Sequence, residues 1–267
     1  MAYKVIVCAK QVPDTNVIRI DPKTGTLIRQ GVPSILNPDD ANALEGALTL
    51  KDRYPGSTVT VVTMGPPQAK DILIEAIAMG ADKGVLLTDR AVGGSDTWAT
   101  SNALAGVIQY LGNFDILIGG RQAIDGDTAQ VGPQIAEKLG IPQVTYVEGL
   151  EIEEDGCTVL AKRQLEDGYE TVEVALPCML TCVKELNEPR YMTYAGIFDE
   201  EMDEKIITLS ATDVNLDPAI VGLKASPTNV FRSFTPKPKG RGIMLDGSDE
   251  KELATRLLVN LKAKHVI

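Results

Sequence analysis

The sequence predicts an α/β protein built on a doubly wound, mainly parallel sheet, with an antiparallel hairpin region and an extended C-terminal arm. Short apolar runs alternate with segments of helical periodicity from residue 5 to residue 140, as in strands joined by right-handed helical crossovers. The dipeptides Asp155-Gly156 and Asp167-Gly168 then separate strand-like runs, which is typical of β-hairpins. A proline-rich stretch at 226–239 and a last helical segment follow.

The first part of the chain is expected to alternate strands and helices. Proline suits the first turn of a helix, so one helix is expected to begin near Pro38. Others are expected after Pro67, ending at Gly80, and from Asp96 to Leu111. The expected strands of this part are residues 5–9, 58–63, 84–88 and 114–119, with a projecting hairpin at 17–29.

The second part is expected to be antiparallel and then irregular. The expected elements are strands at 144–153, 157–164 and 169–176 and a helix at 249–262. Residues 1–216 are expected to form the α/β domain with its hairpins. Because a long irregular tail seldom stays ordered alone, residues 217–267 are expected to form an arm that packs on another chain.

Composition excludes several classes of function. The net charge of −11 over 267 residues argues against a nucleic-acid-binding surface. No apolar stretch approaches the length of a membrane span, and the first residues show no signal-peptide pattern, so we expect a cytoplasmic protein. The single histidine, His265, and the spacing of the four cysteines do not suit a zinc site. We therefore predict no metal site and no catalytic side chain, so that a bound cofactor would carry any chemistry.

Residues 119–140 are typical of an anion-binding turn between a buried strand and a helix. Asp127 and Gln130 have capping-box spacing, and a helix start presents unpaired N–H groups and partial positive charge. Gly126 lets a ligand approach the backbone, and an ordinary strand-to-helix connection is the alternative. Pro133 lies too deep in a helix that begins at Asp127, which predicts a kink or a later start.

Three strand ends are expected to meet around this turn. Parallel sheets bind ligands at the carboxyl ends of their strands, near the point where strand order reverses. The turns available there are residues 8–11, 64–66 and 119–128. For the turn at Met64 a stiff loop before a helix is the alternative account.

Ordered motifs along nearly the whole chain resemble those of the beta, or small, subunit of electron transfer flavoproteins. They are VCAKQVPDT at 7–15, LNPDDANALEGAL at 36–48, TMGPPQA at 63–69, AMGAD at 78–82, GRQAIDGDTAQVG at 120–132, AKRQLEDGYETVEVALPCMLTC at 161–182 and LNEPRY at 186–191. The resemblance implies a sheet of adenine-nucleotide-binding type and a heterodimer with an alpha subunit that carries FAD. It also implies that the protein passes electrons and does not transform a substrate alone.

The resemblance further implies an adenine-nucleotide site in this subunit. Carried over to matching positions, the cofactor-binding residues are Cys8, Ala9, Asn37, Asp39, Met64, Gly65, Arg121, Gln122, Ala123, Ile124, Asp125, Gly126, Asp127, Thr128, Ala129, Gln130, Val131 and Gly132. The amides of 126–129 are expected to hold a pyrophosphate. Asn37 and Asp39 are expected to fix the ribose or adenine, or else to cap a helix. Arg121 is expected to stabilise a reduced anionic flavin, and a surface salt bridge is the competing role.

The family resemblance leaves two ligands open for this site. In ordinary carriers the ligand is a structural AMP; in the bifurcating branch it is a second FAD, which NADH reduces. Residues 125–133 are more similar to the bifurcating pattern, because Gly126 stands where AMP-binding relatives tend to carry a further acidic residue. An added carboxylate would repel a diphosphate, so FAD is the preferred prediction and AMP the alternative.

The resemblance also implies docking partners. Residues 187–198 correspond to a segment that docks a partner dehydrogenase, possible partners including the acyl-CoA dehydrogenase type, and bifurcation would add a low-potential acceptor such as ferredoxin. The expected docking residues are Pro189, Arg190, Tyr191 and Tyr194. Tyr194 stands where relatives often carry an apolar anchor such as leucine, which indicates an aromatic anchor or a different partner.

Two readings from other classes stay open at the level of sequence. One is an ATP-binding regulatory module or nucleotide-activating enzyme, because residues 93–97 are similar to a pyrophosphatase loop. That motif lacks its leading serine, with Val92 in its place, so a helix cap at Asp96 is the better account. The other is a purely structural subunit whose nucleotide never exchanges.

Overall fold

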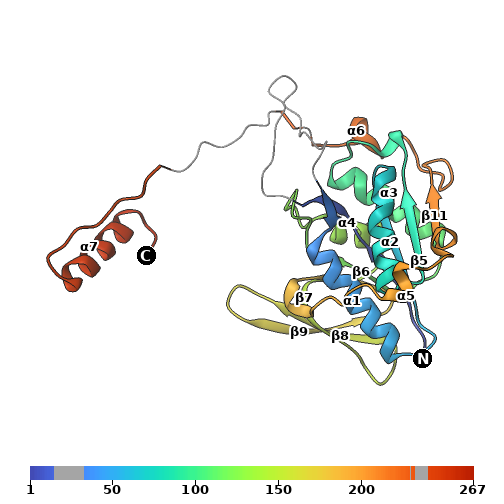
Figure 1. Cartoon of the computed structure of the whole chain (residues 1–267), viewed down its shortest axis with the longest axis horizontal. Coiled ribbons are helices and arrows are strands. Elements are labelled where there is room, and N and C mark those ends of the chain that lie inside the picture. Colours follow the sequence, from blue (N-terminus) through green and yellow to red (C-terminus); the bar gives the residue numbers. More distant parts are fainter. Residues whose placement is uncertain (15–32, 229, 232–239) are drawn as a thin grey trace. The chain divides into compact units, whose positions relative to one another are not determined.

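The computed structural model describes residues 1–14, 33–228, 230–231 and 240–267 (Figure 1). Contacts divide the chain into one unit of Met1–Arg19 with Leu27–Phe231 and a second of Ile20–Thr26 with Arg232–Ile267. The hairpin expected at 17–29 lies outside the described residues. The first unit contains the sheet, and the second contains helix α7 (Glu250–Ala263).

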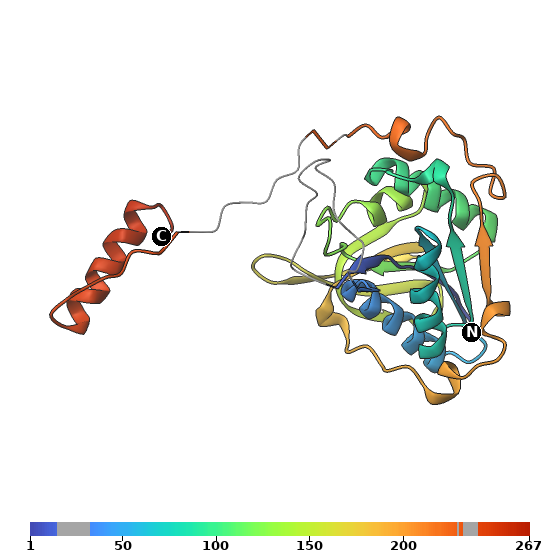
Figure 2. The same cartoon turned by 45° about the horizontal axis from the view of Figure 1, so that its top comes forward.

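The first unit is built on a nine-stranded sheet, in the order β11-β5-β4-β1-β6-β10-β7-β8-β9. Figure 2 shows this sheet together with its helices. From β11 to β7 all neighbouring strands are parallel, and β8 and β9 are antiparallel additions at one edge. The strands are β1 Lys4–Cys8, β4 Thr58–Met64, β5 Lys83–Leu87, β6 Ile116–Gly120, β7 Gln143–Ile152, β8 Thr158–Gln164, β9 Tyr169–Ala175, β10 Cys178–Cys182 and β11 Ile206–Leu209. A separate small sheet pairs β2 (Gln11–Pro13) with β3 (Ser34–Leu36).

Helices cover both faces of the sheet because strand side chains alternate between the faces. Helices α1 and α2 pack on the face that carries Val5, Val7 and Ile118. Helices α3 and α4 pack on the other face, against Ile6 and Leu117. The helices are α1 Pro38–Arg53, α2 Lys70–Met79, α3 Thr97–Leu111, α4 Val131–Leu139, α5 Tyr194–Ile197 and α6 Gly222–Ala225, with 3₁₀ turns at Pro67–Ala69, Arg90–Val92, Lys184–Leu186 and Met202–Lys205. These layers confirm the doubly wound, mainly parallel sheet.

Two expectations about elements need correction. The second part of the sheet is not purely antiparallel, because β7 pairs in parallel with β10 and only then in antiparallel fashion with β8, to which β9 adds. Strand β11 was not expected, and it extends the sheet beyond β5. The later helix start that Pro133 predicted is confirmed: α4 begins at Val131 and not at Asp127, so Pro133 falls in the first turn, where no backbone donor is required.

Residues 217–228 pack on the sheet unit. The Asp96 Oδ2 atom accepts hydrogen bonds from the main-chain N–H and the hydroxyl of Thr228, at 2.9 and 2.8 Å. Ser95 and Asn102 make further contacts, because the Ser95 hydroxyl accepts from Gly222 N–H and the Asn102 amide donates to Ile220 O. The contacts therefore group the chain up to Phe231 with the sheet.

Candidate functional site

The site lies where the strand order of the sheet reverses. Strands β1 and β6 are neighbours, although β4 and β5 come between them in the chain. The helices that follow them, α1 and α4, pack on opposite faces. A crevice at the carboxyl ends of such strands is the usual ligand site of an open α/β sheet. Here it is bordered by residues 9–10 after β1 and residues 121–130 after β6.

Asp40, in the first turn of α1, links the ends of β1 and β6. Its Oδ2 accepts a hydrogen bond from Lys10 N–H and its Oδ1 accepts one from Gly120 N–H, both at 2.8 Å. Burial raises the pKa of Asp40 to about 7, although the hydrogen bonds from Gly120 and Lys10 act in the opposite direction. Asp40 thus holds the ends of β1 and β6 together.

Asn37 shapes the loop that follows β6. Its side chain is fully buried and makes no capping bond to α1. Instead, its Nδ2 donates to Gln122 O at 2.9 Å and its Oδ1 accepts from Ile124 N–H at 3.1 Å. The capping role considered for Asn37 is therefore replaced by a positioning role within the loop.

The two carboxylates of the loop already have partners. Asp125 pairs with Lys10, with 2.6 Å between Nζ and Oδ1. Asp127 does not cap α4, because its Oδ1 accepts a hydrogen bond from Gln122 Nε2 at 2.9 Å. Both Asp127 and Ala129 have left-handed backbone, with φ of 50° and 52°. An irregular loop thus precedes α4, with its negative charges engaged.

The main chain from Thr128 to Gln130 offers N–H groups to a ligand, whereas the N–H groups of Gly126 and Asp127 both donate to Ala123 O. Among the described residues, no hydrogen bond is made to the N–H groups of Thr128, Ala129 or Gln130. Val131 and Gly132 form the first turn of α4, whose amides have no partner within the helix. A Cβ atom placed on Gly126 would meet nothing within 4 Å, so the space beside the loop is open. Such a group of free amides at a helix start suits a phosphate.

Arg121 and Asp39 face each other at the same edge, and each has a buried polar atom without a hydrogen-bond partner among the described residues. The Arg121 Nε and Asp39 Oδ2 atoms are 3.6 Å apart, and neither is hydrogen-bonded to any described residue. Burial raises the pKa of Asp39, and the Arg121 charge partly opposes this shift. The Arg121 guanidinium carbon also lies 5.5 Å from the ring centre of Tyr146. Arg121 is thus partly buried between an acid and an aromatic ring.

The remaining predicted residues lie at the same sheet edge. Cys8 ends β1 between β4 and β6, and burial raises its pKa to about 12. Ala9 N–H donates to Val62 O, and Gly65 N–H to Leu87 O. A Cβ atom on Gly65 would come within 2.8 Å of the Ala69 Cβ, which accounts for glycine after Met64.

The structure brings to this edge three residues outside the predicted cofactor-binding set. Lys10 and Asp40 join the strand ends and the loop, and Tyr146 contacts Arg121 from β7. Both Lys10 and Asp40 lie inside the recognised motifs, which was the available signal. Tyr146 lies outside those motifs, and no pattern in its segment singled it out.

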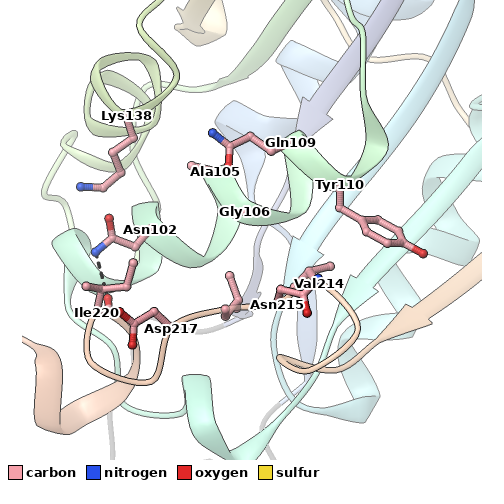
Figure 3. Close-up of a pocket in the computed structure, with 11 residues that line it drawn as sticks. Asn102, Ala105, Gly106, Gln109, Tyr110, Lys138, Val214, Asn215, Asp217 and Ile220 are labelled. Carbon is pink, nitrogen blue, oxygen red and sulfur yellow. Dashed lines mark hydrogen bonds between the residues drawn. The ribbon is translucent and has the colours of Figure 1, made fainter.

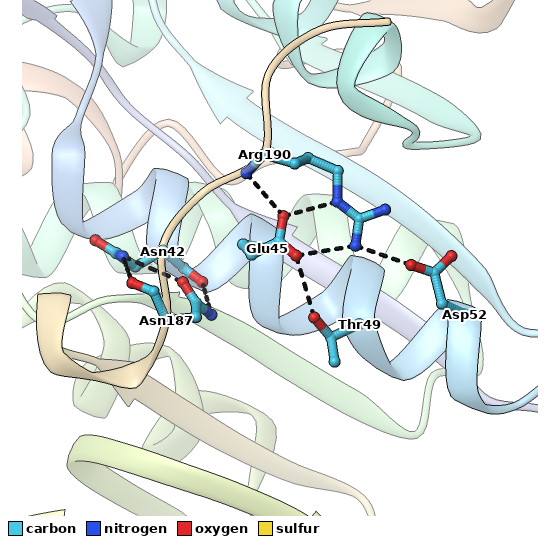
Figure 4. Close-up of polar contacts among 6 residues, drawn as sticks. All are labelled: Asn42, Glu45, Thr49, Asp52, Asn187 and Arg190. Atoms are coloured by element: carbon cyan, nitrogen blue, oxygen red, sulfur yellow. Dashed lines mark hydrogen bonds and ion pairs between the residues drawn. The ribbon is translucent and has the colours of Figure 1, made fainter.

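Arg190 is held by α1, as Figure 4 shows. Its guanidinium donates to both carboxylate oxygens of Glu45, at 2.8 and 2.9 Å, and to Asp52 at 2.9 Å. The Arg190 main-chain N–H also donates to Glu45, and Asn42 and Asn187 exchange hydrogen bonds alongside (Figure 4). The Arg190 side chain is thus engaged within the chain itself.

The residues after Arg190 expose an apolar surface. Tyr191 is 94% exposed and Tyr194 80% exposed. The Tyr194 and Phe198 rings lie 4.7 Å apart between centroids at one turn of α5. Met192, Ile197 and Phe198 are exposed as well. Pro189, by contrast, is partly covered.

Two other features lie apart from this site. Asp96 caps α3, since its Oδ1 accepts from Ala99 N–H at 3.0 Å, in keeping with the helix-cap account of residues 93–97. A pocket of about 590 Å³ lies along α3, between Gln109 and Tyr110 on one side and the segment around Asn215 on the other (Figure 3). None of the predicted cofactor or docking residues lines it.

Comparisons with known proteins identify the family of this chain. The family model described as "Electron transfer flavoprotein domain" matches residues 24–214. Of the helices described, none combines the length and apolarity needed to cross a bilayer.

Similar curated proteins cover almost the whole chain. The Acetobacterium woodii "Caffeyl-CoA reductase-Etf complex subunit CarD" is 59% identical over 99% of this chain and 100% of its own length. The Clostridium acetobutylicum "Electron transfer flavoprotein subunit beta" is 57% identical over 98% of this chain and 99% of its own length. The Anaerotignum propionicum "Acryloyl-CoA reductase electron transfer subunit gamma" is 52% identical over 99% of this chain and 100% of its own length. The chain therefore belongs to the electron transfer flavoprotein family, as a beta-type subunit that serves in electron transfer.

Proposed function

We propose that this subunit binds FAD at the carboxyl edge of its sheet. With an alpha subunit, it would pass electrons from NADH to a partner dehydrogenase and to a low-potential acceptor such as ferredoxin. The observation that carries the proposal is the loop at 126–130, in which the N–H groups of Thr128, Ala129 and Gln130 have no partner among the described residues. This loop lies at the reversal of strand order in a chain of this family.

The residues at this edge fit a dinucleotide. The N–H groups of Thr128 and Ala129 and the start of α4 would hold the pyrophosphate, with Thr128 offering a hydroxyl. The N–H groups of Gly126 and Asp127, which were expected to take part, donate to Ala123 O instead. Arg121 and Asp39 have buried polar atoms without partners, which a ligand's polar groups can satisfy. A bound flavin would supply the electron-transfer chemistry, while these side chains bind and orient it.

The charges around the loop favour FAD over AMP. Asp125 is paired with Lys10 and Asp127 is hydrogen-bonded to Gln122, so both carboxylates are turned to protein partners. Gly126 stands at the position where AMP-binding relatives tend to carry a further acidic residue, and the space beside it is open. A diphosphate therefore meets free amides here without an added carboxylate nearby.

The names of relatives support the choice of partner. Two of them belong by name to a caffeyl-CoA reductase complex and to an acryloyl-CoA reductase. We propose a partner of the acyl-CoA dehydrogenase type, docked on the exposed surface around Tyr191 and Tyr194. We also propose that the C-terminal arm packs on the alpha subunit, through the exposed Leu257 and Leu258 of α7, and that the complex works in the cytoplasm.

Gly126→Val tests the site assignment. A Cβ at Gly126 meets nothing in the protein, so valine should leave the fold intact and fill space that the ligand needs. We expect the heterodimer with the alpha subunit to lose the nucleotide of this subunit and to keep the alpha-subunit flavin. The measurement is nucleotide released by denaturation, separated by chromatography and counted per heterodimer.

Gly168→Val is the matched control. Gly168 lies in the turn between β8 and β9, and a Cβ there also meets nothing within 4 Å. The control should retain the full nucleotide content. Unchanged nucleotide content in Gly126→Val would refute the assignment of the site.

A further inference from the structure

A β-bulge lies beside the proposed site. Between the pairs Leu180–Val144 and Cys182–Val147, strand β7 has two residues, Thr145 and Tyr146, where β10 has only Thr181. Tyr146 has a φ of 59°, in the left-handed region that a bulky side chain rarely adopts. Bulges next to active sites often redirect a side chain, and such backbone strain is common at functional sites.

Neighbouring residues hold the bulge in place. Arg163 of β8 donates from Nε to Thr145 O at 3.1 Å and from a terminal nitrogen to Thr145 Oγ1 at 2.9 Å. On the other side, Val183 N–H donates to Val147 O at 3.1 Å. The carbonyl and hydroxyl of Thr145 are therefore satisfied, and the surrounding structure keeps Tyr146 in its unusual conformation.

The bulge brings the Tyr146 ring against Arg121. The Arg121 main chain is fixed by its N–H donating to Cys182 O at 2.8 Å, directly after β6. Its guanidinium then lies between the Tyr146 ring, 5.5 Å from the ring centre, and Asp39, 3.6 Å away. A guanidinium in this range of a ring is attracted by the ring's negative face.

We propose that Tyr146 is a positioning residue of the nucleotide site, whose bulged backbone holds its ring so as to fix Arg121 at the edge where the ligand binds. The inference rests on the proposed function. Arg121 is left with a buried Nε that no described residue engages. A guanidinium fixed in advance spends less conformational entropy on binding an anionic ligand than a mobile one does.

Tyr146→Asn and Tyr146→Phe separate the ring from the backbone. Asparagine tolerates left-handed backbone, so it keeps the bulge and removes the ring, whereas phenylalanine keeps the ring. Tyr169→Asn is the control. The Tyr169 ring also contacts a cation, since Lys162 Nζ lies 4.0 Å from the ring centre, but Tyr169 belongs to β9 and not to the proposed site. The readout is the dissociation constant of the nucleotide-free full chain for FAD, from flavin fluorescence, and for AMP, from calorimetry.

We expect Tyr146→Asn to weaken FAD binding roughly tenfold, with Tyr146→Phe and Tyr169→Asn close to wild type. Added to Arg121→Gln, Tyr146→Asn should cause no further loss, because the ring acts through Arg121. If Tyr146→Asn weakened FAD binding by the same factor in the Arg121→Gln background as in the wild-type chain, the inference would be overturned. So would wild-type binding by Tyr146→Asn while Arg121→Gln binds weakly, and that result would leave the proposed function standing. Wild-type binding by both Arg121→Gln and Gly126→Val would overturn the site itself, and the inference with it.

Discussion

Replacing Arg190 by methionine removes the guanidinium that joins the segment after β10 to α1. Methionine keeps much of the aliphatic stem, so the change is mainly one of charge and hydrogen bonding. In the native chain Arg190 donates to both oxygens of Glu45 and to Asp52. The Glu45 side chain is only 10% exposed, whereas Asp52 is 64% exposed.

The magnitude follows from what Glu45 keeps after the change. Its carboxylate would retain the Arg190 main-chain N–H and the Thr49 hydroxyl, but no positive charge. Removing one partner of a buried ion pair costs about 3 to 5 kcal/mol. Because Arg190 is itself 32% exposed, water can reach the pair, and we expect a loss of about 3 kcal/mol. The exposed contact with Asp52 adds less than about 1 kcal/mol.

The assay is urea unfolding of the full chain, followed by far-ultraviolet circular dichroism. Lys70→Met is the control in the same unit, because its partner Asp203 is 84% exposed and the pair should contribute less than about 1 kcal/mol. Equal free energies of unfolding for Arg190→Met and Lys70→Met would refute the role of Arg190 as an internal anchor. In that case docking of a partner would be the only role left for Arg190.

Two further changes have directions set by the structure. Burial raises the pKa of Glu45, but the hydrogen bonds and charge of Arg190 outweigh it and hold that pKa below its usual value. The stability from this pair is therefore present above about pH 4.3 and lost as the pH falls through the folded pKa, so urea midpoints of wild type and Arg190→Met should converge in acid. A difference that stays constant down to about pH 3 would contradict this. Gly120→Ala should destabilise the chain by about 1 to 3 kcal/mol, because its Cβ would lie 2.5 Å from Asp40 Oδ1 and 2.7 Å from the Asp39 carbonyl carbon. Gly126→Ala should be nearly neutral, and equal melting temperatures for the two variants would argue against the close packing at Gly120.

The parallel half of the sheet was predictable because buried strands and helix faces leave a regular pattern of apolar residues in the sequence. Apolar residues at helical spacing before Gly80 and after Asp96 indicate α2 and α3, which both pack on the sheet. For α4 the sequence contains two signals, because the capping-box spacing of Asp127 and Gln130 indicated a start at Asp127 and Pro133 indicated a kink or a later start. In the structure Asp127 turns to Gln122 instead, and Pro133 decides the start at Val131.

The finer features of the site depend on contacts between distant segments. Asn37 follows a strand and precedes Pro38, which suits a cap, yet its side chain reaches residues 122 and 124. The left-handed backbone of Tyr146 follows from the pairing of β7 with β10, and nothing in the local sequence favours it. Strand β11 has half-exposed side chains at a sheet edge and so carries little apolar signal.

The central claim is that this subunit carries a flavin of its own. The direct test is to purify the wild-type chain together with its alpha subunit, release the nucleotides by denaturation and count FAD and AMP per heterodimer. We expect two FAD and no AMP for each heterodimer. One FAD and one AMP would contradict it and make this subunit part of an electron carrier with a structural nucleotide.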